Sequence, residues 1–160
     1  MPDFLRFPAT LAMSDVPTHG SVLAFDFGQR RIGVAVGELS LGLAHPLATI
    51  DAADNARRFQ AIARFCDEWQ PVLFVIGLPS HADGQPHEMT RLSERFAARL
   101  HETFARPCVL VDERYTSVLA ESLLTEAQCF GRKRKPALDQ LAAQQILHTY
   151  FCVAVNHALT

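Results

Sequence analysis

The sequence lacks several features that would place it in a specialised class of protein. No apolar run approaches the roughly 18 residues that a membrane-spanning helix needs. The chain opens without a basic segment followed by an apolar one, so we expect no signal peptide, no membrane partner and a cytoplasmic location. Internal repeats and low-complexity segments are also missing. A single globular domain is the simplest interpretation, and 160 residues suffice for a substantial core.

Cysteine and histidine occur, but not at the spacings of disulfide frameworks or zinc sites. The four cysteines lie far apart with no Cys-x-x-Cys pair, so we expect buried thiols. None of the seven histidines forms a His-x-x-x-His pair. Asp26-Phe27-Gly28 matches the magnesium-binding triplet of protein kinases, but the glycine-rich loop, strand lysine and His-Arg-Asp loop of kinases are missing. Asp26 therefore needs another explanation.

The balance of charge does not itself indicate a nucleic-acid partner. The formal net charge is −2, and 49% of the residues are hydrophobic. The basic residues are nevertheless unevenly distributed, because the segment "GRKRKP" at 131–136 contains four consecutive cations. Such a run is usually a solvated loop and becomes informative only beside a site that handles phosphate.

The hydrophobic pattern predicts an α/β fold with a mixed sheet and helices on both faces. We interpret residues 1–20 as a poorly ordered extension and residues 21–155 as one domain. Arg57 and Arg58 lie mostly off the apolar stripe of the first expected helix, which Asp51 or Asp54 would cap. In chain order, the pattern predicts strands at 21–27, 32–36 and 41–50, a helix at 59–69, a strand at 72–79, a helix at 89–100, a strand at 108–114, and helices at 116–123 and 136–151.

Acidic residues stand at the ends of these otherwise apolar elements. Asp26 ends the first strand and Asp112-Glu113 end the last, while Asp139 interrupts the apolar stripe of the final helix. Burying an unpaired carboxylate costs several kcal/mol, and gathering three adds mutual repulsion. A compensating cation is therefore expected at this end of the sheet.

Two kinds of cation could supply this compensation. Arg31 or Arg114 could pair with Asp26 or Asp112, with Asp139 serving as a cap at the start of its helix. Alternatively, the carboxylates could hold Mg²⁺ or Mn²⁺, which prefer oxygen ligands and support phosphodiester cleavage in pairs. The basic segment directly precedes the helix that carries Asp139, where it could bind a nucleic-acid backbone.

Four segments resemble the YqgF family, also called RuvX, in order and spacing: "AFDFGQRRIGVAVGE", "VIGLPSHADGQ", "VDERYTS" and "KRKPALDQLAAQQILHTYF". The resemblance covers about residues 21–151 and implies an RNase H-like fold with a five-stranded sheet in the order 3-2-1-4-5. It also implies a hydrolase that cleaves phosphodiester bonds, with the 5′ end of pre-16S rRNA or a Holliday junction as its substrate. Structured RNA within a pre-ribosome, or branched DNA, would then be the partner of a monomer or weak homodimer.

Matched by position, Asp26, Glu113 and Asp139 correspond to the family's catalytic, metal-binding acids. Glu113 is preferred to Asp112 because alternation lets only one of them face as Asp26 does, and the longer side chain better bridges the roughly 10 Å between the first and fifth strands. Glycine and proline motif positions match at Gly33, Gly77, Pro79 and Gly84. Expected substrate-binding residues are Arg31, Arg114 and Thr116, with His81 and the cations Arg132, Lys133, Arg134 and Lys135.

The sequence differs from the family pattern at several positions, and other functions are also compatible with its motifs. Gly37-Glu38, Ser80-His81-Ala82 and Tyr115 replace the more usual residues, which leaves the substrate contacts of the loop open. A DNA junction resolvase would use the same acids, whereas a ribosome-assembly factor would bind RNA without cleaving it. An actin-like or sugar-kinase-like ATPase also begins with an Asp-x-Gly strand, but it needs a second phosphate loop and a much longer chain.

Overall fold

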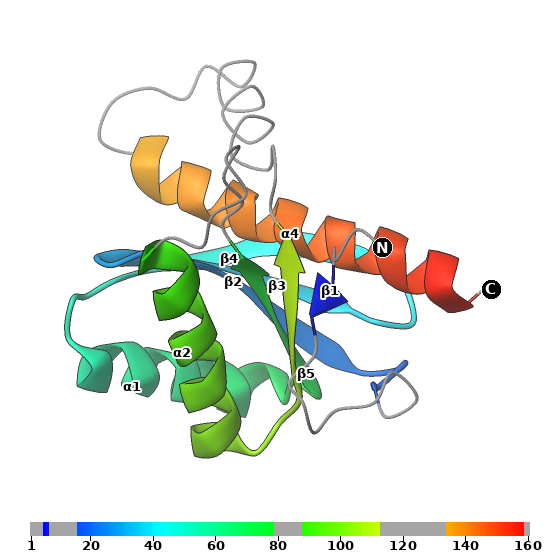
Figure 1. The fold of residues 1–160 in the computed structure, drawn as a ribbon, viewed down its shortest axis with the longest axis horizontal. Coiled ribbons are helices and arrows are strands. Elements are labelled where there is room, and N and C mark those ends of the chain that lie inside the picture. The colour runs from blue at the N-terminus through cyan, green and yellow to red at the C-terminus, as the bar shows by residue number, and fades with distance from the viewer. Residues whose placement is uncertain (1–4, 7–15, 79–87, 113–133, 159–160) are drawn as a thin grey trace.

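Six strands and three helices make up the part of the chain that the structure, a computed structural model, describes: residues 5–6, 16–78, 88–112 and 134–158 (Figure 1). Within these residues no helix is both long and apolar enough to span a membrane. The strands are β1 (Leu5–Arg6), β2 (Ser21–Phe27), β3 (Arg31–Glu38), β4 (Leu43–Asp51), β5 (Leu73–Leu78) and β6 (Cys108–Asp112), and the helices are α1 (Asn55–Trp69), α2 (Glu88–Phe104) and α4 (Arg134–Ala158).

The strands form one mixed sheet in the order β1-β6-β5-β2-β3-β4. Strands β2, β3 and β4 are an antiparallel meander, whereas β5 and β6 run parallel to β2. The five strands from β2 to β6 therefore confirm the predicted 3-2-1-4-5 order. Strand β1, which the sequence did not predict, pairs antiparallel with β6 at the edge of the sheet and places Leu5 opposite Val111.

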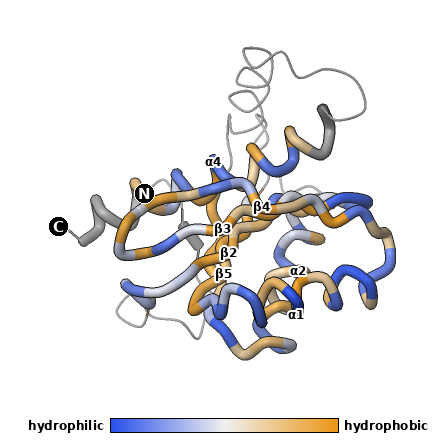
Figure 2. The backbone as a smooth tube through the Cα atoms, turned by 180° about the vertical axis from the view of Figure 1, so that it is seen from behind, coloured by the Kyte–Doolittle hydropathy of each residue, from blue (hydrophilic) through white to orange (hydrophobic). Residues whose placement is uncertain are grey.

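Side chains of the central strands alternate between two apolar cores, as the two-residue period of a strand requires. On β2, Leu23 and Phe25 lie in the core shared with α1 and α2, while Val22 and Ala24 lie in the core shared with α4. Figure 1 shows the same arrangement, with α4 above the sheet and α1 and α2 below it. In Figure 2 the hydrophobic strands β2 and β5 lie between these helical layers, which confirms that helices cover both faces.

Helix α1 begins as predicted at its cap but buries a residue that the sequence analysis placed elsewhere. The Asp54 side chain accepts a hydrogen bond of 2.9 Å from the backbone N–H of Ala56, so Asp54 is the cap of the two candidates, Asp51 and Asp54, that the sequence offered. Arg58 is only 3% exposed, however, and its expected place off the apolar stripe was wrong. It stands four residues before the buried Ile62, on the same helical face.

Helix α4 crosses the sheet at its β2–β3–β4 side. It begins at Arg134, two residues earlier than predicted, because Pro136 is tolerated in a first turn whose backbone N–H groups have no helical partner. The Gln140 side chain donates to Thr49 Oγ1 at 3.2 Å, and the Gln144 side chain donates to the Ala44 carbonyl at 2.9 Å. These two bonds attach α4 to β4. The helix predicted at 116–123 lies outside the described residues.

Candidate functional site

Asp26 lies near the end of β2, on the face of the sheet that α4 covers. It follows Val22 and Ala24 at the two-residue spacing, and both of these residues pack in the α4 core. In the antiparallel pairing of β2 with β3, Asp26 stands directly opposite Gly33. Residues paired in this way have Cβ positions about 4.5–5.5 Å apart, so whatever lies over Gly33 is an immediate neighbour of Asp26.

The group that lies over Gly33 is Asp139 of α4. A Cβ atom built on Gly33 would stand 2.0 Å from the Asp139 carbonyl oxygen and 3.0 Å from the Asp139 Cβ. Only glycine leaves room for this approach of helix to strand. The sheet register and the glycine contact together bring Asp26 and Asp139 to one point, although 113 residues of sequence separate them.

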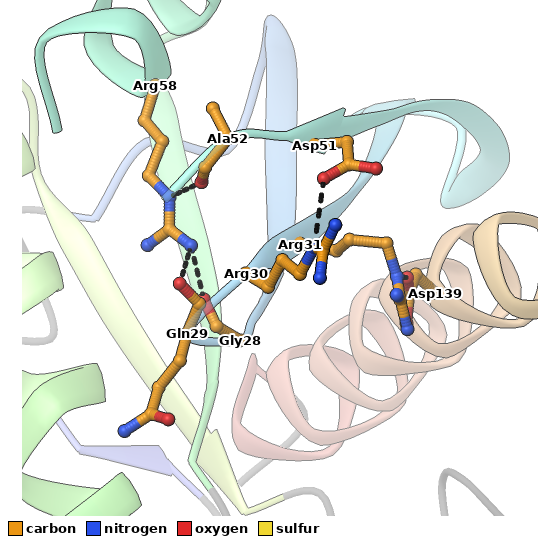
Figure 3. Close-up of polar contacts among 8 residues, drawn as sticks. All are labelled: Gly28, Gln29, Arg30, Arg31, Asp51, Ala52, Arg58 and Asp139. Atoms are coloured by element: carbon orange, nitrogen blue, oxygen red, sulfur yellow. Dashed lines mark hydrogen bonds and ion pairs between the residues drawn. The ribbon is translucent and has the colours of Figure 1, made fainter. Parts of the chain in front are cut away.

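Arg31 forms an ion pair with Asp139 at the same place (Figure 3). Its Nε donates to Asp139 Oδ2 at 2.8 Å, and the two side chains are 29% and 21% exposed. The hydrogen bond to Asp139 and the charge of that carboxylate raise the pKa of Arg31, against a smaller effect of burial. Arg31 thus pairs with the acid of α4, whereas the sequence offered Asp26 or Asp112 as partners of Arg31 or Arg114.

The turn between Asp26 and Arg31 is fixed from the other face of the sheet by Arg58 (Figure 3). Its guanidinium donates to the carbonyls of Gly28 (2.9 Å), Gln29 and Ala52, and it lies 5.4 Å from the centre of the Phe27 ring. Burial lowers the pKa of this guanidinium. Arg58 was not among the predicted site residues, although its spacing of four residues from Ile62 on the buried stripe of α1 was a usable signal.

Arg30 lies next to Arg31, at the exposed tip of the turn. Its Nε is 3.8 Å from Asp51 Oδ1, and both side chains are largely exposed, at 81% and 64%. Exposed pairs of this kind contribute about 0–1 kcal/mol, so Arg30 adds little to the stability of the turn. The positive charge of Arg30 therefore lies at the protein surface beside the site, in an exposed ion pair.

Several predicted site residues cannot be compared with the structure. Glu113, Arg114, Thr116, His81, Arg132 and Lys133, together with the motif residues Pro79 and Gly84, lie outside the described residues. Arg134 and Lys135 form the first turn of α4, and their side chains also lie outside the description. Of the predicted acids and their arginine partners, the structure therefore brings Asp26, Arg31 and Asp139 together.

The donors of the described site suit a hard divalent cation. Asp26 and Asp139 offer carboxylate oxygens, which are the ligands that Mg²⁺ and Mn²⁺ prefer. Within the described ranges no group of three histidine, cysteine, aspartate or glutamate side chains gathers at one place. The two aspartates thus fit part of a metal site, and one of them is already held by Arg31.

Comparison with known proteins places the chain among nucleases. The RuvX family, described as Holliday junction resolvase, matches residues 20–152. Proteins named "Putative pre-16S rRNA nuclease" are 62% identical over 130 residues in Chromobacterium violaceum and 58% identical over 132 residues in Neisseria meningitidis. These matches cover 81% and 82% of this chain, and 95% and 87% of the relatives.

One solved structure supports the fold independently of sequence. T. thermophilus RuvC in complex with Holliday junction substrate matches with a TM-score of 0.54 and 12% sequence identity. The match covers 86% of this chain and 97% of that chain. At this identity the likeness concerns the fold, and it agrees with the RNase H-like sheet described above.

Proposed function

Since this chain belongs to the RuvX family of nucleases, which hydrolyse phosphodiester bonds, we propose that it is a metal-dependent endonuclease that processes the 5′ end of pre-16S rRNA. One observation carries the proposal: Asp139 lies over Gly33, directly opposite Asp26 on the neighbouring strand. Two carboxylates so close together repel each other unless a cation lies between them or beside them. Arg31 supplies one such charge, and a divalent metal bound by both acids would supply the other.

We propose that Asp26, Asp139 and Glu113 hold the metal. The described residues of β6 support Glu113. Val109 and Val111 pack in the α4 core, and because every second residue of a strand faces the same side, position 113 is the next one on that face. Mg²⁺ or Mn²⁺ bound there supplies Lewis acidity and positive charge at the scissile phosphate. In this proposal Arg31 orients the Asp139 carboxylate through the 2.8 Å hydrogen bond.

Substrate contacts are proposed on the sequence expectations. Arg114, Thr116 and His81 would bind phosphate oxygens near the acids, and Arg132, Lys133, Arg134 and Lys135 would hold the nucleic-acid backbone beside the start of α4. The described backbone supports this placement, since α4 begins at Arg134 and reaches Asp139 in little more than one turn. A basic segment here would add a strong, salt-dependent attraction for RNA.

The partner in this proposal is structured pre-16S rRNA within a pre-ribosome, and the protein would act in the cytoplasm as a monomer or weak homodimer. A second candidate is cleavage of branched DNA, which the family's description as Holliday junction resolvase favours. Both reactions would use the same acids. An RNA-binding assembly factor without cleavage is the remaining alternative, and mutation of Asp26 separates it from the other two.

The test is cleavage of a 5′-extended small-subunit rRNA precursor and, in parallel, of a four-way DNA junction. Wild-type protein, Asp26→Asn and the matched control Asp51→Asn are assayed in Mg²⁺, Mn²⁺ and EDTA. The control removes the same charge from the exposed end of β4. We expect metal-dependent RNA cleavage that only Asp26→Asn abolishes. Junction cleavage alone would identify the DNA reaction, and tight RNA binding without any cleavage would contradict the nuclease proposal.

A further inference from the structure

A cavity lined by arginines lies on the face of the sheet opposite the candidate site. It has a volume of about 300 Å³ and opens between α1, α2 and the end of β2. Arg58, Arg95 and Arg99 line it, together with the rings of Phe27, Phe59 and Phe96. No carboxylate is among its described lining residues. The cavity therefore concentrates positive charge beside an aromatic wall.

Within the described ranges, no acid forms an ion pair with these three arginines. Arg95 and Arg99 stand one helical turn apart on α2, are exposed, and have no hydrogen bond or ion pair among the residues that the structure describes. Arg58 is buried and donates to backbone carbonyls, which carry no net charge. These carbonyls accept hydrogen bonds from Arg58 but do not balance its positive charge, which therefore adds to that of Arg95 and Arg99 at the cavity.

From this arrangement we infer that the cavity binds a backbone phosphate of the nucleic acid on which the protein acts. Arginine is the preferred side chain for phosphate because its planar donors match the phosphate oxygens. The volume lies at the lower end of the range of ligand cavities, about 300–1,000 Å³, which leaves room for a phosphate and part of its sugar. The exposed arginines reach the ligand from α2, while Arg58 forms the floor.

The position of the cavity relates it to the acids. Phe27 follows Asp26 directly and points to the opposite face, so the two sites lie around one end of β2. A nucleic-acid strand that reached both sites would pass around the β2–β3 turn. The exposed Arg30 stands on this turn. That the phosphate belongs to a nucleic acid rests on the proposed function. That the cavity binds an anion follows from its arginines alone.

The experiment measures binding without cleavage. A fluorescent single-stranded RNA of 12 nucleotides and, separately, AMP are titrated in EDTA over a range of salt concentrations. The proteins are wild type, the double variant Arg95→Ala/Arg99→Ala, and a control, Arg64→Ala/Arg91→Ala. The control removes one exposed arginine of α1 and one of α2, neither of which lines the cavity. Thermal unfolding verifies that each variant is folded.

We expect the cavity variant to bind the RNA at least tenfold more weakly than the control does. The slope of log K against log salt should fall by about 0.7 for each phosphate contact that is lost. Equal losses in the two double variants, or no loss in either, would overturn the inference. AMP binding as tight as RNA binding, and lost in the same variant, would instead assign the cavity to a free nucleotide. Because no cleavage is scored, failure of the nuclease proposal would not affect this result.

Discussion

The close contact between Gly33 and α4 predicts that Gly33→Ala, which adds one methyl group, will disturb the candidate site. In Gly33→Ala the new Cβ would stand 2.0 Å from the Asp139 carbonyl oxygen, whereas ordinary contact begins at 3.4 Å. The difference, 3.4 − 2.0 = 1.4 Å, is the distance by which helix and strand must separate. Both atoms belong to or adjoin backbone, so no side-chain rotation can relieve the overlap.

Two consequences follow from this displacement. Overpacking typically costs about 1–3 kcal/mol, and we expect the upper end because backbone must move, which lowers the melting temperature by about 6–12 °C. Catalysis should suffer more, because misplacing a catalytic group by about 1 Å can reduce the rate about 100-fold. The assays are thermal unfolding and RNA cleavage per folded molecule.

Gly37→Ala is the matched control for Gly33→Ala. A Cβ at Gly37 would stand 2.3 Å from the Leu43 carbonyl oxygen and 2.9 Å from a Leu147 methyl, so stability should fall in this variant too. Leu147 lies about two helical turns beyond Asp139, so cleavage per folded molecule should stay within a few fold of wild type. A Gly33→Ala protein with wild-type stability and activity would refute the close packing of α4 on β3. Equal activity losses in the two variants would refute the specific link to Asp139.

Two further substitutions test the hydrogen bonds of Arg58 and the burial of Cys108. Arg58→Met leaves three carbonyls without their donor, so we expect the free energy of unfolding in urea to fall by about 3 kcal/mol. The control Arg57→Met, at an exposed position, should change it by less than about 0.5 kcal/mol. Equal effects would contradict the assignment of these hydrogen bonds to Arg58. Burial raises the pKa of the Cys108 thiol to about 12, so the unfolded state ionises first and stability falls as pH rises above about 9. Between pH 8 and pH 10, Cys108→Ala should lose about 1.4 kcal/mol less stability than wild type, and identical losses would contradict this assignment.

The fold was predictable where local pattern and chain order agree. The five main strands and the helices on both faces follow from hydrophobic spacing, and the strand order follows from the family resemblance. The sequence narrowed the cap of α1 to Asp51 or Asp54, and the structure selects Asp54. Strand β1 was not predictable, because two residues carry no periodicity and its pairing with β6 spans about 100 residues of sequence. Strand β1 can pair only after β6 has formed the edge of the sheet, and the local sequence does not show this.

The candidate site was predictable in its acids but not in its partners. Asp26 and Asp139 stood out because each interrupts an apolar element, and the structure brings them together. The partner of Arg31 was open in the sequence, since several carboxylates lay within its reach and only the seating of α4 on Gly33 selects Asp139. The burial of Arg58 depends on carbonyls of the β2–β3 turn, and the sequence of α1 alone does not reveal them.

The central claim is that Asp26 and Asp139 belong to one metal site. The most direct measurement is Mn²⁺ binding, followed by electron paramagnetic resonance of the free ion, in wild type, Asp26→Asn, Asp139→Asn and the control Asp51→Asn. The account predicts that each of the first two substitutions weakens Mn²⁺ binding at least tenfold while the control leaves it unchanged. Wild-type Mn²⁺ affinity in both Asp26→Asn and Asp139→Asn would contradict it.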